Sequence, residues 1–132
     1  MSGAGDGRVV LVTGGARGLG RDLADAFAAE GDRVVTCGRN APAGEQAAEF
    51  VKCDVRDPDQ VAEMFEAVAG RFGRLDVLVN NAGGTPYVEA AGMSPRLFER
   101  VVALNLLAPF YVAQQANRIM QEQAGGGVIV NI

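Results

Sequence analysis

Short apolar runs alternate along this chain with longer segments in which apolar residues recur every three or four positions. The runs are dominated by valine and leucine and largely lack the apolar–polar alternation of a strand that faces water. Such continuous runs are typical of strands covered on both faces of a sheet. They predict five strands, at 8–13, 33–37, 49–54, 75–80 and 128–132.

Three of the intervening segments predict helices. Residues 19–30 have helical spacing and are followed by a glycine, which suits a helix C-terminus. The second helix has Asp57 as a candidate N-cap and Pro58 at its first position. Gln60 is placed to reach back to the cap, and Gly73 ends the helix.

The third predicted helix starts at Ser94 and Pro95, a residue pair typical of a helix N-terminus. It extends to about residue 123, and Pro109 inside it is expected to produce a kink. The connection 39–48 contains a proline and a glycine, so any helix within it is expected to be short.

Strands that alternate with helices in this order form βαβ units, which build a parallel sheet. We therefore predict an α/β fold, a Rossmann-like doubly wound parallel sheet with three layers, α/β/α. Residues 1–7 are small and polar and predict a disordered lead-in, whereas 8–132 predict the N-terminal part of a single domain. Because the fifth strand ends on the last residue, the sheet is expected to be incomplete at the C-terminus.

The composition narrows the range of functions. The formal net charge is -4 and no basic stripe is visible, which argues against nucleic-acid binding. With no histidine in the chain, a Ser-His-Asp triad and a His-containing zinc site are excluded from it. Cys37 and Cys53 form no CxxC metal pair. The first apolar run is too short to span a membrane, and we expect a cytoplasmic protein with reduced thiols and no metal.

A glycine-rich motif, TGGARGLG at 13–20, stands between the first predicted strand and its helix. Glycines let the backbone turn sharply and approach a pyrophosphate, and the helix N-terminus supplies free N–H groups for phosphates. The spacing is TGxxxGxG and differs from the common GxGxxG fingerprint. A tight turn that needs glycine for steric reasons alone would have the same composition.

A second motif, NNAG at 80–83, directly follows the fourth predicted strand, at the edge where open α/β sheets bind ligands. Together, TGxxxGxG and NNAG resemble the short-chain dehydrogenase/reductase family, and the resemblance extends over essentially the whole chain from Arg8. Asp54 with Val55, and Asn105 in the third predicted helix, match further positions at which the family carries functional residues.

The resemblance implies a role for each matched residue. Asp54 and Val55 would contact adenine, Asn80 would tie neighbouring strand backbone together, and Gly83 would avoid a collision with the nucleotide. Asn105 would belong to the catalytic relay and hold a water. A simple loop acid at Asp54 and a satisfied buried amide at Asn105 are the alternatives. The residues expected to bind the cofactor are Gly14, Arg17, Gly18, Leu19, Gly20, Arg39, Asp54, Val55, Asn81, Ala82 and Gly83, and Asn105 is the one expected in catalysis.

The end of the second predicted strand bears on the choice of cofactor. A carboxylate about 20 residues beyond the glycines would hold the 2'-hydroxyl of NAD(H). Here Gly38 takes that place and Arg39 follows it, while Arg17 lies within the glycine-rich turn. Two guanidinium groups suit a 2'-phosphate, so NADP(H) is favoured over NAD(H). The alternative is that Arg39 simply points into water.

The chemistry that the family resemblance implies needs a serine and a Tyr-x-x-x-Lys motif. Neither Tyr87 nor Tyr111 has a lysine four residues later, and the sole lysine is Lys52. The serines, Ser2 and Ser94, lie in the lead-in and at a helix start. The resemblance implies an NAD(P)-dependent oxidoreductase that transfers hydride between nicotinamide and a secondary alcohol or ketone. Because the serine and the Tyr-x-x-x-Lys motif are missing, we expect the 132-residue chain alone to be inactive.

Two other functions remain open at this point. One is a non-catalytic dinucleotide-binding or scaffold protein of the same fold. The other is an S-adenosylmethionine-dependent methyltransferase, although that class prefers an acid where Gly38 and Arg39 stand. The expected partners are a small alcohol or ketone, with no nucleic acid and no membrane. The resemblance further implies a homodimer or homotetramer that uses the helix predicted at 95–123.

Overall fold

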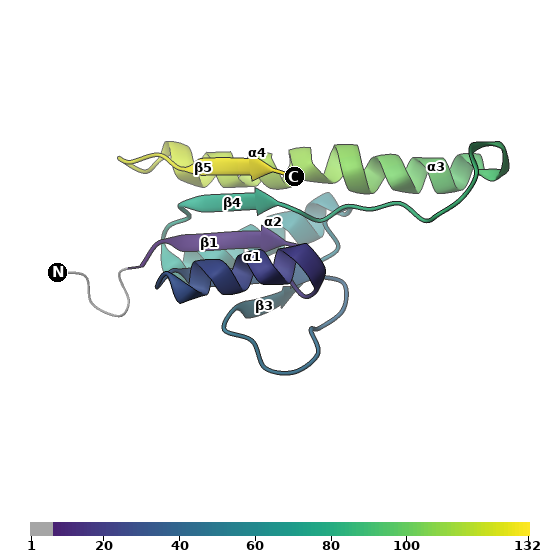
Figure 1. The fold of residues 1–132 in the computed structure, drawn as a ribbon. Helices are drawn as coiled ribbons and strands as arrows, with labels where there is room; N and C mark the ends of the chain where they lie inside the picture. Colours follow the sequence, from purple (N-terminus) through teal and green to yellow (C-terminus); the bar gives the residue numbers. More distant parts are fainter. Residues whose placement is uncertain (1–6) are drawn as a thin grey trace.

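A single parallel sheet forms the centre of the molecule. The structure is a computed structural model that describes residues 7–132, so residues 1–6 of the predicted lead-in lie outside the described part. Its strands are β1 (Val9–Thr13), β2 (Arg33–Gly38), β3 (Glu49–Lys52), β4 (Val77–Asn80) and β5 (Val128–Asn131). Across residues 7–132 all strand pairs are parallel, in the order β3-β2-β1-β4-β5 (Figure 1).

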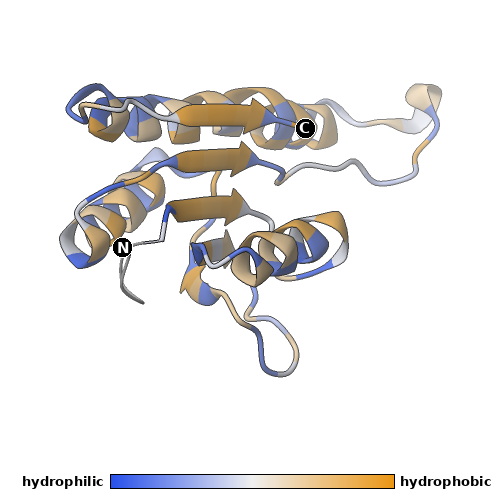
Figure 2. Ribbon diagram, turned by 60° about the vertical axis from the view of Figure 1, so that its left-hand side comes forward, coloured by the Kyte–Doolittle hydropathy of each residue, from blue (hydrophilic) through white to orange (hydrophobic). Residues whose placement is uncertain are grey.

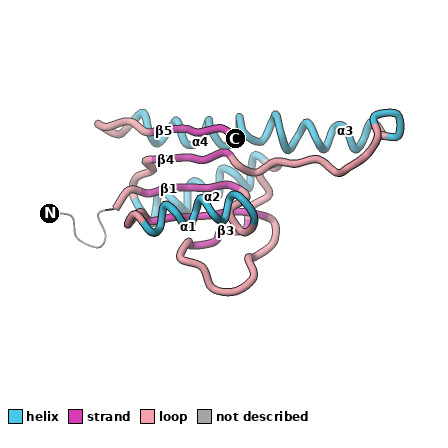
Figure 3. Tube along the Cα trace, viewed as in Figure 1, coloured by secondary structure: helices cyan, strands magenta, loops and turns pink. Residues whose placement is uncertain are grey.

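Helices cover both faces of this sheet, as Figures 1 and 3 show. Helix α1 (Gly18–Ala29) packs on one face, and α2 (Pro58–Phe72) with α4 (Ala108–Gln121) packs on the other. The central strands β1 and β4 are apolar along most of their length (Figure 2), and every residue of β1 is buried. The architecture is therefore the predicted three-layer, Rossmann-like α/β fold.

The helix N-termini predicted at Asp57 and Ser94 are confirmed. Asp57 Oδ1 accepts a hydrogen bond from the Asp59 amide at 2.9 Å, and Ser94 Oγ accepts one from the Leu97 amide at 3.1 Å. Gly73 ends α2 in the left-handed conformation, with φ of 69°. The sequence predicted these helix ends correctly because a capping residue interacts with backbone groups within its own turn of the helix.

The helix predicted from Ser94 to about residue 123 is continuous in the structure, and the irregularity expected at Pro109 is a widened turn just before it. The structure has α3 (Pro95–Val102), a π-helical turn η2 (Ala103–Leu107) and then α4, after a 3-10 turn η1 (Ala90–Gly92). Pro109 has no N–H to donate to the carbonyl four residues earlier. The preceding turn widens instead, and the Ala108 amide donates to the Ala103 carbonyl, five residues back.

The last strand forms an edge of the sheet with apolar side chains that the described residues leave uncovered. Val128, Val130 and Ile132 are exposed by 56%, 39% and 69%. An apolar edge of this kind presents unpaired backbone groups beside apolar side chains. The sheet of the described chain is thus open on the side of β5.

Candidate functional site

A groove of about 840 Å³ lies where the loops after β1, β2, β3 and β4 meet at the carboxyl ends of the strands. The loops that form it lie at the same end of the molecule in Figure 3. All eleven residues expected from the sequence to bind the cofactor line this groove. They are Gly14, Arg17, Gly18, Leu19, Gly20, Arg39, Asp54, Val55, Asn81, Ala82 and Gly83.

The N-terminus of α1 opens on the groove without a cap. Arg17 occupies the N-cap position in an extended conformation, and within the described chain no side chain hydrogen-bonds to this helix end. By contrast, α2 and α3 each have a side-chain cap. Gly18 has φ of +57°, and a Cβ built on it would meet nothing within 4 Å. Unpaired amides and a partial positive charge therefore meet open space, an arrangement that suits an anion.

Two glycines of the turn are required by the protein's own packing. A Cβ on Gly14 would lie 3.0 Å from the Ala82 Cα. A Cβ on Gly20 would overlap the Gly14 carbonyl oxygen and the Asn81 side-chain amide. The Gly14 amide also donates to the Cys37 carbonyl at 2.9 Å. The steric role of the glycines is therefore real, and it brings α1 close to the loop after β4.

Thr13 and Asn81 bind this turn to the loop after β4. Thr13 Oγ1 accepts hydrogen bonds from the Asn81 and Ala82 amides at 3.0 and 2.9 Å. Asn81 Nδ2 donates to the Thr13 and Gly14 carbonyls at 3.1 and 3.3 Å. The sequence predicted Asn81 only as a wall facing the cofactor, whereas its side chain braces the turn. Thr13 was missed, although its place as the last residue of an apolar strand was a signal.

The expectation that Asn80 ties strand backbone together is wrong. Asn80 Nδ2 donates to the Pro109 carbonyl at 3.2 Å and to Asn131 Oδ1 at 3.0 Å. The backbone groups of β4 are already engaged in the parallel ladders with β1 and β5. The side chain of Asn80 is left to join the first turn of α4 to the end of β5.

Asn105 lies on the π-helical turn and clamps the loop after β4. Its Nδ2 donates to the Gly84 and Val101 carbonyls at 2.7 and 2.9 Å, and its Oδ1 accepts from the Gly84 amide at 2.9 Å. The amide is satisfied, as the structural alternative supposed, but it is exposed, so the expected burial is wrong. The π-helical turn leaves this residue at the surface of the described chain. Both donor hydrogens of the Asn105 amide are already in use.

Gly83 gives a test of this clamp, because a Cβ there would lie 2.9 Å from Asn105 Oδ1. We expect Gly83→Ala to lower the free energy of unfolding by about 1–2 kcal/mol through this overlap. In an Asn105→Ala background the overlapping atom is gone, so most of the cost should disappear, a coupling of about 1 kcal/mol. Urea denaturation of the four chains of this cycle measures it. Additive effects would show that the overlap does not limit residue 83.

Asp54 lies in the groove wall, paired with an arginine that the sequence analysis missed. Its Oδ1 accepts from the Arg56 amide and Nε at 3.1 and 3.0 Å, and its Oδ2 accepts from Arg56 Nη2 at 2.8 Å. The hydrogen bonds from the Arg56 side chain lower the pKa of Asp54, so this carboxylate is ionised at neutral pH. Arg56 follows Asp54, the acid just after β3, by two residues. This spacing was the sequence signal that could have identified Arg56 as its partner.

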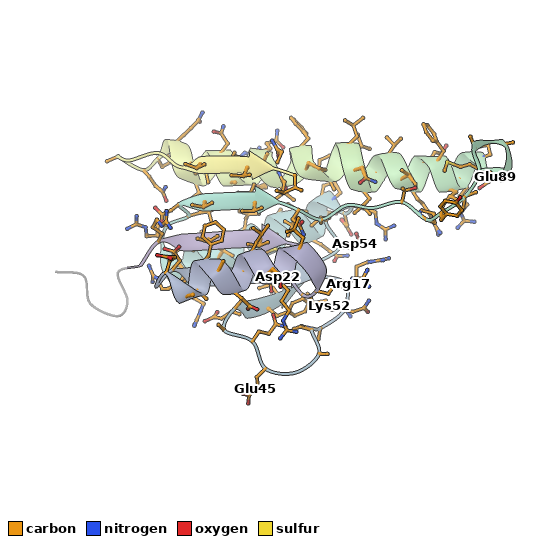
Figure 4. The ribbon with its side chains drawn as sticks, in the orientation of Figure 1. Arg17, Asp22, Glu45, Lys52, Asp54 and Glu89 are labelled. Carbon is orange, nitrogen blue, oxygen red and sulfur yellow. The ribbon has the colours of Figure 1, made fainter. Side chains whose placement is uncertain are left out.

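Three further arginines, of which the sequence analysis missed Arg21, surround the same groove. Arg17 and Arg39 are exposed, and neither forms an ion pair within residues 7–132. Arg21 donates to the Ala43 and Glu45 carbonyls, both at 3.1 Å, and so holds the loop between β2 and β3. Figure 4 shows Arg17, Lys52 and Asp54 at the same end of the sheet. Arg17, Arg21 and Arg39 therefore form a cationic rim of the groove on the side of β2.

Two buried cysteines line the groove between these charged residues. Cys53 is the first residue after β3, and its amide donates a hydrogen bond of 2.9 Å to the Gly38 carbonyl at the end of β2. This bond places Cys53 beside Cys37, and both residues line the groove. The hydrogen bond with Cys53, together with burial, raises the pKa of the Cys37 thiol. Cys37 is therefore neutral at physiological pH, and with Val55 it gives the groove an uncharged floor.

Other kinds of site find less support in the described chain. Within residues 7–132 there is no cluster of three potential metal-ligating His, Cys, Asp or Glu side chains. No helix in this part of the chain is both long and apolar enough to cross a bilayer.

The doubly wound sheet, the TGxxxGxG turn and the groove at its carboxyl edge define a nucleotide-binding α/β protein. The model of the short chain dehydrogenase family matches residues 8–132, and the chain belongs to this family. Membership leaves the methyltransferase alternative without support.

Named relatives agree with this assignment. The chain is 38% identical over 137 residues to D-threitol dehydrogenase of Mycolicibacterium smegmatis, with 96% of this chain and 52% of the relative covered. It is 42% identical over 124 residues to the 3-oxoacyl-[acyl-carrier-protein] reductase MabA of Mycobacterium tuberculosis, covering 92% and 49%. The chain thus spans about half the length of the curated relatives it matches.

Solved structures also match this chain over most of its length, while the chain covers only about half of each of them. The ligand-free aldohexose dehydrogenase of Thermoplasma acidophilum superposes with a TM-score of 0.89 at 34% identity, covering 95% of this chain and 48% of the other. A variant of actinorhodin polyketide ketoreductase, solved with NADPH, gives a TM-score of 0.84 at 35% identity, covering 96% and 53%.

Proposed function

We propose that residues 8–132 are the N-terminal, cofactor-binding part of a single domain in an NAD(P)-dependent oxidoreductase. The observation that carries this proposal is the uncapped N-terminus of α1, which opens on a groove lined by all eleven expected residues. The amides of residues 18–20 would hold the pyrophosphate, and Asp54 and Val55 would border the adenine. When bound, the nicotinamide supplies or accepts a hydride at its C4.

The substrate class follows from the relatives and the family. D-threitol dehydrogenase and the aldohexose dehydrogenase are named for sugar or polyol substrates, and MabA is named for a 3-oxoacyl group on acyl-carrier protein. We infer that the full-length protein interconverts a secondary alcohol and a ketone. The serine and the Tyr-x-x-x-Lys motif of the family have no counterpart in this sequence, so the 132-residue chain alone should be inactive. In this proposal Asn105 supports the relay.

Titration of the full-length protein with NADPH, NADH and S-adenosylmethionine tests the proposal. Binding of a nicotinamide dinucleotide with no binding of S-adenosylmethionine is the expected result. Turnover of alcohols or ketones then separates an enzyme from a non-catalytic dinucleotide-binding or scaffold protein. Absence of binding by both dinucleotides to folded protein would refute the assignment.

The cationic rim favours NADP(H) over NAD(H). Arg17 and Arg39 form no salt bridge within residues 7–132, although the charge of Arg39 acts on Asp54, and Gly38 supplies no carboxylate for a ribose 2'-hydroxyl. Both arginines line the groove. Guanidinium groups at this position suit the extra phosphate on the 2'-oxygen.

Exchange of Arg39 tests the cofactor preference. We expect Arg39→Ala to reduce the ratio of NADPH to NADH affinity by about tenfold, because one charge-assisted contact to the 2'-phosphate is lost. Gly38→Asp should act in the same direction, since a Cβ there meets only the Phe50 ring at 3.7 Å and the Asn40 carbonyl oxygen at 3.9 Å, both ordinary contacts. Isothermal titration measures both ratios. Arg96→Ala, on the exposed helix α3, is the matched control, and an equal change in that variant would exclude a specific role.

An apolar surface on the helix pair supports self-association. Phe98, Leu106, Leu107 and Phe110 are exposed by 57%, 67%, 42% and 62% along α3, η2 and α4. A patch of large apolar side chains on a soluble protein commonly marks an interface. We propose a homodimer or homotetramer in the cytoplasm, and light scattering of the full-length protein, compared with a Phe110→Glu variant, tests the assembly.

A further inference from the structure

Two cysteines meet on one face of the sheet, beside the candidate cofactor groove. Cys37 pairs with Val51 in the ladder between β2 and β3, and Cys53 follows Val51 by two positions. Because side chains two residues apart on a strand point to the same face, the two cysteines are diagonal neighbours. Both belong to one buried cluster, both line the groove, and neither is in a disulfide. The 132 residues contain no third cysteine that would compete for either thiol.

The contact between the two thiols makes them chemically unequal. The hydrogen bond with Cys37 lowers the pKa of the Cys53 thiol, whereas the same bond, together with burial, raises the pKa of Cys37. Cys53 is therefore the thiol of the pair that ionises first, and Cys37 stays protonated beside it. The thiolate is the form of cysteine that reacts with oxidants, and a thiol next to the oxidised sulfur converts it into a disulfide.

The groove is the route by which a reagent reaches this pair. Cys37 and Cys53 are 0% and 1% exposed, so neither presents its thiol on the outer surface of the molecule. Both nevertheless line the groove of about 840 Å³, which admits a molecule little larger than water, such as hydrogen peroxide. A dinucleotide that fills the groove would cover the two thiols.

The backbone of each cysteine is tied to a different wall of the groove. The Cys37 carbonyl accepts a hydrogen bond of 2.9 Å from the Gly14 amide, which belongs to the glycine-rich turn. Cys53 directly precedes the groove residues 54–55, and its amide donates to the Gly38 carbonyl at 2.9 Å. Displacement of either cysteine is therefore transmitted to a segment that shapes the groove.

A disulfide between these two positions requires such a displacement. Diagonal neighbours in a sheet have Cα atoms roughly 7–8 Å apart. Disulfide-bonded cysteines have Cα atoms only about 4.4–6.8 Å apart. Strand β2 is held between β1 and β3, whereas β3 is an edge strand whose ladder ends at Lys52. The segment that begins at Cys53 is therefore the part that shifts when the two sulfurs approach each other.

We propose that Cys37 and Cys53 form a redox-sensitive modification site, in which a disulfide between them distorts the groove and lowers its affinity for the dinucleotide. The inference rests on the proposed dinucleotide binding and adds to it a regulation of the same site. In a reducing compartment, disulfides that do form are usually transient and redox-sensing. The oxidant has the chemistry of a hydroperoxide.

The oxidation balances with hydrogen peroxide. The Cys53 thiolate attacks one peroxide oxygen, the O–O bond breaks, and the departing hydroxide takes up a proton to leave as water. Cys53 is then a sulfenic acid, whose sulfur is attacked by the Cys37 thiol. The S–O bond breaks, the S–S bond forms, and the thiol proton leaves with the hydroxyl group as a second water. The two sulfurs are oxidised and the peroxide is reduced, and a dithiol such as dithiothreitol reverses the change by exchange.

Peptide mapping and titration of the full-length protein test the proposal. After treatment with hydrogen peroxide, trypsin should release peptides 34–39 and 53–56 joined to each other, since each is preceded by, and ends in, an arginine or lysine. Once the peroxide is removed, NADPH should bind about tenfold more weakly than to the untreated protein, a usual size for coupling between two sites. Dithiothreitol should restore the affinity. Saturation with NADP⁺ before the treatment should slow the cross-linking.

Cys37→Ala and Cys53→Ala are the variants, each compared with its own untreated sample. Either substitution removes one sulfur, so the peroxide-dependent loss of affinity should disappear in both. If one variant does not fold, the other and the peptide map of the wild type still decide.

Three results would overturn the inference alone: no joined peptides in the oxidised wild type, joined peptides with unchanged affinity for NADPH, or a loss of affinity that persists in the alanine variants. Failure of the reduced wild type to bind either dinucleotide would overturn the proposed function and, with it, the proposed regulation.

Discussion

A Gly20→Ala protein is expected to lose about 3 kcal/mol of unfolding free energy and all measurable dinucleotide binding. The new methyl group would overlap the Gly14 carbonyl oxygen, which is backbone, and the Asn81 side-chain amide, which is held by two hydrogen bonds. Neither group can move without opening the turn that carries the groove. Urea denaturation and titration with NADPH measure the two losses.

Gly70→Ala provides the matched control in α2. A Cβ on Gly70 meets nothing within 4 Å, and the residue lies in a regular helix. Alanine should be tolerated there or increase the stability by up to about 1 kcal/mol, because it lowers the backbone entropy of the unfolded chain. If the two variants have equal stability, close packing at residue 20 is not what the turn requires.

The second large effect is expected at Thr13, which is 1% exposed. Replacement by valine preserves the shape and removes the hydroxyl that accepts from the Asn81 and Ala82 amides. The Ala82 amide in the groove wall would then lack a partner, whereas the Asn81 amide would keep its 3.1 Å hydrogen bond to the Val79 carbonyl. The expected loss of unfolding free energy is about 2 kcal/mol, within the range of about 1–3 kcal/mol for one unpaired group.

Thr13→Ser retains the hydroxyl and loses only a methyl group, so it should cost about 1 kcal/mol. The comparison between valine and serine therefore isolates the hydrogen bonds from the packing. Chemical denaturation gives the stabilities, and hydrogen exchange at Asn81 and Ala82 reports directly on the two amides. Slow exchange of the Ala82 amide in Thr13→Val would mean that another group satisfies it.

Most of the fold could be predicted because its signals are local. An apolar run such as 8–13 predicts a strand buried on both faces, and Asp57 and Ser94 cap helices through hydrogen bonds within one turn. The widened turn at Ala103–Leu107 could not be predicted in kind. A proline inside a helical pattern indicates an irregularity, but the choice between a kink and a widened turn depends on tertiary contacts.

In the candidate site, too, the features with local sequence signals could be predicted, and those that depend on tertiary contacts could not. The motifs placed all eleven expected residues in one groove, because loops at the carboxyl ends of parallel strands converge. They could not assign hydrogen-bond partners to Asn80, Asn81 or Asn105, since those partners come from segments distant in sequence. Arg56 was overlooked because arginine is common on surfaces and its value depends on the orientation that Asp54 imposes.

The order of the strands has a consequence for synthesis and turnover. The turn after β1 and the loop after β4 meet in space although 68 residues separate Thr13 from Asn81. A growing polypeptide cannot complete the groove proposed to bind the pyrophosphate until both segments have left the ribosome and docked. A ligand captured only by the finished sheet protects the whole of it, by about 2.7 kcal/mol at a concentration of 100 times Kd. Cellular dinucleotide levels would then influence how long each molecule survives proteolysis.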